Sequence, residues 1–330
     1  MYSLFANCIP VKGHNRSIIY DLGQYTYHYI PNSLYDLLIK YETTNEWYND
    51  VTPNEYEIID EYINFLITNN LVLNCKNIDC KCFAKLNTFW ETPEQLSIIA
   101  LKYDGKKSFY LLLKIEEFIR NSYAKNLSIN YFGNETDLLI LLKSLKNTYV
   151  NNIELYLLYS DFSKNEVEDI VIENPAISRI ILLGAKNNSS KYLDNGKQII
   201  KYETTSNSIN HPDESISFVV NRDFFIESQS FNCYYNKRIF IDEQGGIKLN
   251  NELESIDNVV NVKFDELLKN ELIKKYWAVC KDKIEVCKDC EHRYMCYDSR
   301  LPKQNQSGCW FYETECGYNP YIAKWQVEEK

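Results

Sequence analysis

Several features that define common protein classes are missing from this sequence of 330 residues. No uninterrupted apolar run approaches the roughly 20 residues that a membrane-spanning helix needs. The opening residues, MYSLFANCIPVKG, contain neither a basic segment nor an apolar segment with a cleavage site, as a secretory signal would. We therefore expect no membrane partner and a cytoplasmic location.

Positive charge is too sparse and too scattered for a protein that binds nucleic acid. The chain has 36 Lys and Arg against 46 Asp and Glu, which gives a net charge of -10. Binding to duplex nucleic acid needs a concentrated basic face, so we expect no nucleic-acid partner. Three frequent catalytic signatures are also missing, namely the P-loop, G-x-G-x-x-G and H-E-x-x-H.

Residues 1–90 have the pattern of a small mixed α/β domain. Two β-rich runs on either side of Gly23 predict a hairpin. Apolar residues at helical spacing predict one helix that begins at Pro31 and a second that follows Pro53, and residues 71–75 then read as a strand. A hairpin, two helices and a short strand together outline a winged-helix-like domain.

Residues 91–229 alternate between strand-like and helical segments. Four apolar, β-rich runs are separated by helical stretches, and two further runs could extend the series to about six strands. This alternation indicates right-handed βαβ units on a parallel sheet. Because six strands are fewer than the usual eight, we predict a partial (β/α) barrel or an open sheet. The runs are residues 96–103, 126–132, 152–159, 178–185, 197–204 and 216–220.

Residues 230–330 begin with more regular structure than they end with. A β-hairpin is predicted to turn at Gly245 and Gly246, and residues 264–277 have a helical pattern. The tail that follows is rich in cysteine and has little regular pattern. It has too few apolar residues to offset its chain entropy, so we expect cross-links or a metal to order it.

The cysteines of this tail are spaced as metal ligands are. In a reducing compartment, clustered cysteines are more often metal ligands than disulfides. Cys287 and Cys290 form a C-x2-C knuckle, which aims two thiolates at one ion or cluster, and Cys296 supplies a third ligand. The fourth is Cys316 or Cys309. Thiolates suit both zinc and iron-sulfur clusters, and the spacing does not separate the two.

The same cysteines resemble the SPASM domain, a C-terminal domain of many radical S-adenosylmethionine enzymes that modify peptides. That domain has a first cysteine, a hairpin glycine, a cysteine five residues later, then C-x2-C-x5-C-x3-C and a final cysteine, and it holds two auxiliary [4Fe-4S] clusters. The positions that match this pattern are Cys233, Gly245, Cys287, Cys290, Cys296 and Cys316.

Two departures from the pattern change what the resemblance implies. Asn250 and Arg300 stand where the family has cysteines of the first auxiliary cluster, so Cys233 alone remains of that set. The second set is complete, and the resemblance implies one [4Fe-4S] cluster on Cys287, Cys290, Cys296 and Cys316. Cys280 and Cys309 could rebuild part of the lost site, and Cys309 could replace Cys316. Zinc at the four thiolates remains the alternative.

The motif that binds S-adenosylmethionine in this class is absent. Radical enzymes of the class carry C-x3-C-x2-C in the loop after the first barrel strand, whereas the loop at residues 102–110 contains no cysteine. A nearby group, Cys75, Cys80 and Cys82, has a different spacing and precedes that strand. We therefore expect no binding of S-adenosylmethionine and no radical chemistry. The β/α region resembles a degenerate radical S-adenosylmethionine core, and no catalytic residue is assigned.

With its opening segment, residues 6–22, the chain resembles the SPASM-domain peptide maturases of grasp-with-spasm systems, which accompany an ATP-grasp ligase and a ribosomal precursor peptide. The resemblance implies that residues 1–90 are a RiPP recognition element, which binds a leader peptide as an added strand. Residues 91–229 would be the degenerate partial barrel, and residues 230–330 the SPASM domain. We expect an accessory maturation factor. The alternatives are an iron-sulfur enzyme that modifies the precursor by redox or sulfur chemistry, and a structural zinc protein.

Overall fold

The computed structural model describes the chain except for residues 50–51, 77–84, 106–107, 194–197, 205–215 and 327–330. The chain forms two compact units, and neither is continuous in sequence. The first consists of Met1–Trp90, Ile216–Cys233 and Val279–Lys330, and the second of Glu91–Ser215 and Tyr234–Ala278. The predicted division into residues 1–90, 91–229 and 230–330 stays a prediction. Among the described residues, no helix is long and apolar enough to cross a membrane.

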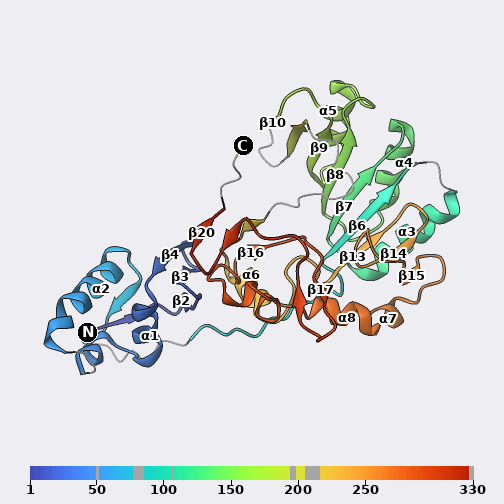
Figure 1. Cartoon of the computed structure of the whole chain (residues 1–330). Helices are drawn as coiled ribbons and strands as arrows, with labels where there is room; N and C mark the ends of the chain where they lie inside the picture. The colour runs from blue at the N-terminus through green and yellow to red at the C-terminus, as the bar shows by residue number, and fades with distance from the viewer. Residues whose placement is uncertain (50–51, 77–84, 106–107, 194–197, 205–215, 327–330) are drawn as a thin grey trace. The chain divides into compact units, whose positions relative to one another are not determined.

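The N-terminal part of the first unit contains two small sheets and two helices (Figure 1). One sheet has three antiparallel strands in the order β2-β3-β4, and the other pairs β1 with β5. Strand β5 confirms the strand predicted at residues 71–75, whereas β1 and β2 were not predicted. The elements are β1 (Tyr2–Leu4), β2 (Cys8–Val11), β3 (Ser17–Asp21), β4 (Thr26–Ile30), α1 (Asn32–Lys40), η1 (Thr44–Asn49), η2 (Pro53–Glu55), α2 (Tyr56–Thr68) and β5 (Val72–Asn74).

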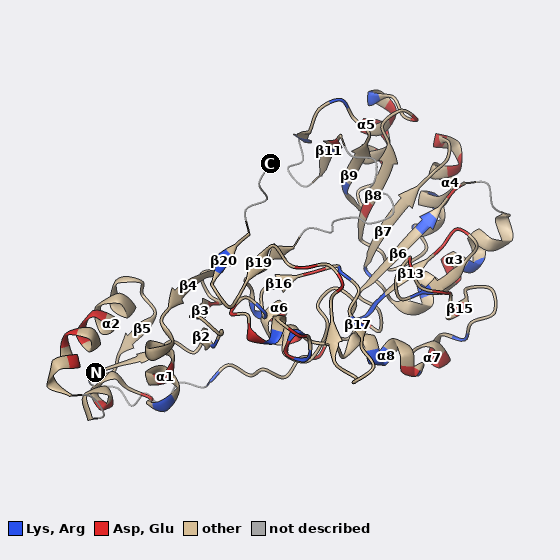
Figure 2. Ribbon diagram, in the orientation of Figure 1, with Lys and Arg blue, Asp and Glu red and all other residues tan. Residues whose placement is uncertain are grey.

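Local sequence explains where these elements begin and end. The turn between β3 and β4 is closed by Asp21, whose Oδ1 accepts hydrogen bonds from the backbone N–H groups of Gly23 and Gln24, each at 3.0 Å. Pro31 lies between β4 and α1 and has an extended backbone. Proline has no backbone N–H to donate to a neighbouring strand, so the strand ends before it. The predicted hairpin and both predicted helices are confirmed. Helix α2 contains three exposed acidic residues, Glu57, Asp60 and Glu61, and no Lys or Arg (Figure 2).

A separate apolar core supports this part of the first unit. It is formed by side chains from the sheet and from both helices, and it includes the fully buried Leu34, Trp47 and Leu66. The opposite face of the β2-β3-β4 sheet packs elsewhere, because Ile18 and Tyr20 of β3 belong to a second core with Phe225 and Met295. One sheet therefore connects the N-terminal helices to the cysteine-rich segment.

The remainder of the first unit has short elements. Its strands form two-residue antiparallel pairs, β12 with β16, β17 with β18, and β19 with β20. Such short pairs agree with the expected lack of regular pattern. The elements are β12 (Ser217–Phe218), α6 (Arg222–Ser228), η5 (Lys281–Lys283), η6 (Cys287–Asp289), β16 (Cys296–Tyr297), β17 (Lys303–Gln304), β18 (Trp310–Phe311), β19 (Tyr318–Asn319) and β20 (Lys324–Trp325).

The second unit is built on a nine-stranded, mainly parallel sheet with the order β10-β11-β9-β8-β7-β6-β13-β14-β15. Six central strands are parallel, and antiparallel strands complete both edges. The strands are β6 (Ile98–Tyr103), β7 (Asn126–Tyr131), β8 (Asn152–Leu158), β9 (Ile177–Leu183), β10 (Ser189–Tyr192), β11 (Ile199–Glu203), β13 (Arg238–Ile241), β14 (Gly246–Lys248) and β15 (Asp257–Asn258). This mixed α/β arrangement is compatible with a partial barrel-like core.

Helices connect successive parallel strands, as the alternating pattern predicts. Each of the three crossover helices is preceded by a capping residue, whose side chain accepts a hydrogen bond from a backbone N–H of the first turn. The capping residues are Ser108 for α3, Asn134 for α4 and Ser163 for α5. The helices of this unit are α3 (Phe109–Ser122), α4 (Glu135–Leu145), α5 (Lys164–Glu173), α7 (Phe264–Leu267) and α8 (Glu271–Trp277).

Two local predictions are wrong. The run at 216–220 does not extend the parallel sheet; it forms β12, which pairs antiparallel with β16, so that Phe218 lies opposite Cys296. The single helix predicted over 264–277 is instead two helices, α7 and α8. The side chain of Asn270 accepts hydrogen bonds from the backbone N–H groups of Leu272 and Ile273, and this cap begins α8. The predicted hairpin at Gly245 is confirmed, and it pairs with β6 as the next strand of the sheet.

Candidate metal centre

The C-x2-C knuckle is a tight turn in the first unit. Cys287 begins the 3-10 turn η6, and the backbone N–H of Cys290 closes it by donating to the Cys287 carbonyl at 3.0 Å. Val286, directly before it, has a φ of 67°. Its ψ of -47° gives the geometry of a γ-turn with positive φ, which is rare and strained, and such backbone strain is often found at functional sites.

Four of the predicted thiols influence one another electrostatically. Burial raises the pKa values of Cys287, Cys290 and Cys296, that of Cys296 to about 12. The neighbouring thiolates raise them further, and Cys316 contributes to this effect at Cys287 and at Cys296. All four cysteines are half-buried. Because ligand thiols must be deprotonated, metal binding here releases protons.

Cys316 and Cys309 lie in different surroundings. The half-buried sulfur of Cys316 accepts a hydrogen bond from the backbone N–H of Tyr318 at 3.4 Å. Cys309 is exposed, and its described hydrogen bonds stay within the turn that begins at Asn305. The charge of Cys316 thus acts on Cys287 and Cys296, whereas Cys309 is exposed. That Cys316 is the fourth ligand stays a prediction.

The alternative ligands Cys233 and Cys280 lie on the same unit. Burial raises the pKa of Cys233, and the charges of Glu227, Cys296 and Cys280 add to that increase. Asn250, which replaces a family cysteine, belongs to the second unit, where its side-chain amide donates to the Tyr235 hydroxyl at 2.8 Å. Cys80 and Cys82 lie outside the described residues, whereas Cys75 is disulfide-bonded, contrary to the preference for metal ligands over disulfides.

Arg300, the other replaced position, is part of a buried charge network. Its guanidinium donates two hydrogen bonds to Asp298, at 2.9 and 2.7 Å, and the ammonium of Lys281 donates to the same carboxylate. Lys281 also donates to the Tyr312 hydroxyl at 3.0 Å. Burial alone would raise the pKa of Asp298, but Lys281 and Arg300 more than offset this and lower it to about 2. Two cations on one carboxylate leave a net positive charge beside Cys287.

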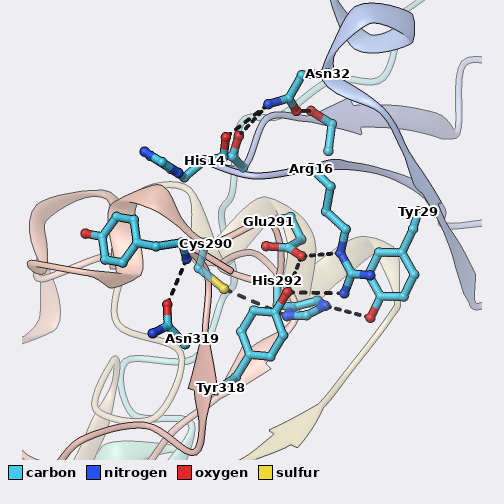
Figure 3. A network of polar contacts seen from close by, with 12 residues as sticks. His14, Arg16, Tyr29, Asn32, Cys290, Glu291, His292, Tyr318 and Asn319 are labelled. Atoms are coloured by element: carbon cyan, nitrogen blue, oxygen red, sulfur yellow. Dashed lines mark hydrogen bonds and ion pairs between the residues drawn. The ribbon is translucent and has the colours of Figure 1, made fainter. Parts of the chain in front are cut away.

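A second network surrounds Glu291, between the ligand candidates Cys290 and Cys296 (Figure 3). The Glu291 side chain has no exposed surface, and its Oε1 accepts a hydrogen bond from Arg16 Nε at 2.7 Å. The Tyr318 hydroxyl donates to the same oxygen. The Tyr20 hydroxyl donates to the Glu291 backbone carbonyl at 2.8 Å. Residues of the β2-β3-β4 sheet thus hold the segment between the two candidate ligands.

His292 is buried beside Cys290. Its Nδ1 lies 3.8 Å from the Cys290 sulfur, and its Nε2 lies 2.9 Å from the Tyr29 hydroxyl. The ring packs against Tyr318 and Phe218, with centroids 4.5 and 4.8 Å apart. Burial lowers the pKa of His292 to about 4, so the ring is neutral near pH 7. A neutral imidazole can act as a hydrogen-bond partner or as a metal ligand.

Sequence reasoning identified the cysteines but missed most of the residues that hold them in place. Asp298 follows Cys296 by two positions and precedes Arg300 by two, and this acidic–basic pair beside a candidate ligand was a local signal that could have marked it. Arg16 and Glu291 are 275 positions apart, and no periodic or motif signal connects them.

Comparison with known proteins adds little to this picture. No protein-family model matches the chain, and no curated protein does. Two similar solved structures are crystal structures of SuiB from Streptococcus suis, one of them bound to S-adenosylmethionine. The bound form has a TM-score of 0.31 and 11% identity, and it covers 89% of this chain and 94% of SuiB. The other has a TM-score of 0.27 and 10% identity over the same shares. Likeness at this level carries no argument about function.

Proposed function

We propose that this chain is an accessory protein of peptide maturation that holds one [4Fe-4S] cluster, of the second auxiliary SPASM type, on Cys287, Cys290, Cys296 and Cys316. The observation that supports the proposal is that these four half-buried thiols are electrostatically linked: Cys316 raises the pKa values of Cys287 and Cys296, and those two raise that of Cys290. The loop that follows β6 supplies no cysteine for a second, S-adenosylmethionine-binding cluster. The chain therefore has the donors for an auxiliary cluster without those for radical initiation.

The residues around the thiols fit an anionic group. Four thiolates are the ordinary ligands of a [4Fe-4S] cluster. Lys281 and Arg300 share the single carboxylate of Asp298, which leaves one positive charge uncompensated. Lys281 lowers the pKa values of both Cys287 and Cys296. This charge would offset part of the negative charge of the ligand set. When bound, such a group would order the tail and could exchange electrons.

The N-terminal sheet is proposed to bind the precursor peptide. Strands β2 and β4 form the two edges of the described β2-β3-β4 sheet, and an extended leader peptide can pair with a strand edge through backbone hydrogen bonds. Under this proposal residues 1–90 act as the recognition element, an ATP-grasp ligase is the partner that forms the bond, and all three work in the cytoplasm.

The metal content of anaerobically purified protein tests the first part. We expect about four iron and four sulfide per chain, with the broad visible absorption of an iron-sulfur cluster. One zinc and no sulfide would instead mean a structural zinc site, which the four thiolates can also form.

A reconstituted reaction tests the accessory role. Precursor peptide and ligase are incubated with and without this chain, and the mass of the precursor is followed. We expect modification by the ligase to become faster or more complete when the chain is present. A change of mass with the chain and S-adenosylmethionine but no ligase would overturn the proposal. A change that requires the chain and a reductant, without the ligase, would favour an iron-sulfur enzyme.

A further inference from the structure

Cys290, Glu291 and His292 place three different donor types close together. The sulfur of Cys290, a carboxylate oxygen of Glu291 and a ring nitrogen of His292 all lie within 4.8 Å of one another. The distance from Cys290 Sγ to His292 Nδ1 is 3.8 Å. Tetrahedral zinc with ordinary bond lengths separates a sulfur and a nitrogen ligand by about 3.6 Å. Little movement would be needed for both to reach one ion.

The carboxylate of Glu291 has an oxygen that its surroundings do not use. Arg16 and Tyr318 both donate to Oε1. Oε2 is buried and has no hydrogen-bond partner among the residues that the structure describes. A buried carboxylate oxygen without a partner is costly and calls for an explanation, such as an ion.

Two of the three donors are also oriented by a neighbour, as metal ligands commonly are. Tyr29 lies at Nε2 of His292, which leaves Nδ1 facing the sulfur of Cys290. Arg16 holds Oε1 of Glu291, which leaves Oε2 available. In metal sites the second atom of a ligating imidazole or carboxylate is typically held in this way, and the contact fixes the ligand's orientation.

We propose that Cys290, Glu291 and His292 bind a divalent transition-metal ion, with zinc as the best match to one sulfur, one oxygen and one nitrogen donor. The negative charges of the Cys290 thiolate and the Glu291 carboxylate neutralise the ion. The three protein donors leave one position for water or another small ligand. This site goes beyond the proposed cluster but shares Cys290 with it, and a thiolate sulfur can bridge two metals.

The site would also join two parts of the first unit. Its three ligands lie in the cysteine-rich segment, whereas Arg16 and Tyr29, which orient Glu291 and His292, come from the N-terminal residues that form β3 and β4 or lead into them. An ion bound here stabilises the contact between the β2-β3-β4 sheet and the knuckle, because it fixes the side chains on which that contact depends.

The test uses the full chain with Cys287→Ser and Cys316→Ser, which disables the four-thiol set and keeps Cys290. Cobalt(II) is titrated anaerobically as a spectroscopic probe for zinc. We expect one equivalent to bind, with visible ligand-field bands and a sulfur-to-cobalt charge-transfer band. Adding His292→Gln or Glu291→Gln should weaken binding at least tenfold, whereas adding His14→Gln, a histidine outside the site, should not.

Several outcomes would overturn the proposal. They are the absence of cobalt binding in the parent variant, equal affinity in the His292→Gln protein, or the absence of a charge-transfer band. Proton NMR of the cobalt form gives a readout that does not depend on affinity. A hyperfine-shifted imidazole N–H should be present in the parent and missing after His292→Gln.

The metal content of the wild-type protein separates this site from the cluster. Iron and sulfide without an additional zinc or cobalt ion would contradict the mixed-donor site and leave the cluster proposal standing. One divalent ion that persists in Cys316→Ser but is lost in Glu291→Gln, without iron in any variant, would support the site and contradict the cluster.

Discussion

The guanidinium of Arg16 lies over the ring of Tyr29, with its central carbon 3.4 Å from the ring centroid. The same guanidinium donates to Glu291 at 2.7 Å. Arg16 therefore connects an aromatic residue of β4 to a buried carboxylate next to a candidate metal ligand. Cation–π contact and ion pair fix one side chain between two segments that are distant in sequence.

Replacing Arg16 should be costly because its partner is buried. In Arg16→Met the Glu291 carboxylate, which has no exposed surface, loses its counterion. Breaking such a pair from one side typically costs about 3–5 kcal/mol of unfolding free energy. Urea denaturation measures this. The matched control is Lys12→Met, which removes an ion pair with Asp36 between two half-exposed side chains and should lower the unfolding free energy far less. Equal losses in the two variants would contradict the role assigned to Arg16.

In the charge network at Asp298, removing the carboxylate should destabilise the protein more than removing one of its two cations. Asp298→Asn leaves both Lys281 and Arg300 without a carboxylate, whereas Arg300→Gln leaves the Lys281–Asp298 pair intact. Because uncompensated buried charge is the costly state, Asp298→Asn should lower the unfolding free energy by about 2 kcal/mol or more beyond Arg300→Gln. Denaturation of the two variants side by side checks this, and the reverse order would show that the network is not organised around Asp298.

Cysteine substitutions decide the fourth ligand. Cys316→Ser should lose most of the bound iron and sulfide, because Cys316 is a neighbour of Cys287 and Cys296, whereas Cys309→Ser should keep them, because Cys309 is exposed. Iron and sulfide analysis after anaerobic purification is the measurement. Retention in Cys316→Ser together with loss in Cys309→Ser would assign the fourth position to Cys309.

Removing the metal should loosen the N-terminal sheet as well as the tail. His14 donates its backbone N–H to the Asp289 carbonyl, and Tyr20 donates its hydroxyl to the Glu291 carbonyl, so the knuckle is bonded to residues around β3. We expect chelation to increase amide hydrogen exchange in β3 and β4 and in residues 287–297. The crossover helices α3 to α5, in the second unit, are the internal control and should exchange as before. Unchanged exchange in β3 and β4 would show that metal and sheet are not coupled.

Elements with a strong local pattern were predictable from the sequence. The strands β6 to β9 and the helix α3 follow from apolar periodicity and capping residues, which act over a few positions. The run at 216–220 was misassigned because two β-rich residues can pair with any available edge, and the edge it meets, β16, lies 78 positions later at Cys296. Pairing of this kind depends on long-range packing rather than on propensity.

The candidate site likewise has a part that was predictable from local spacing and a part that was not. The C-x2-C spacing is local and pointed directly to Cys287 and Cys290. The partners of Glu291 and His292 were not predictable, because Arg16 and Tyr29 lie more than 260 positions away and their residue types are common on any surface. Oε2 of Glu291, unpartnered among the described residues, is visible only in three dimensions.

The order of the segments has a consequence during synthesis on the ribosome. The second unit is complete once residue 278 has been made, whereas the first needs residues 279–330 to close. At 5–20 residues per second, residues 1–90 wait roughly 10 to 40 s for that segment. Until then the side chains of Ile18 and Tyr20 lack Met295, one of the residues that bury them. These apolar side chains of the N-terminal sheet therefore stay incompletely buried while the second unit is being made, and the four proposed ligands are present together only once residue 316 has been added.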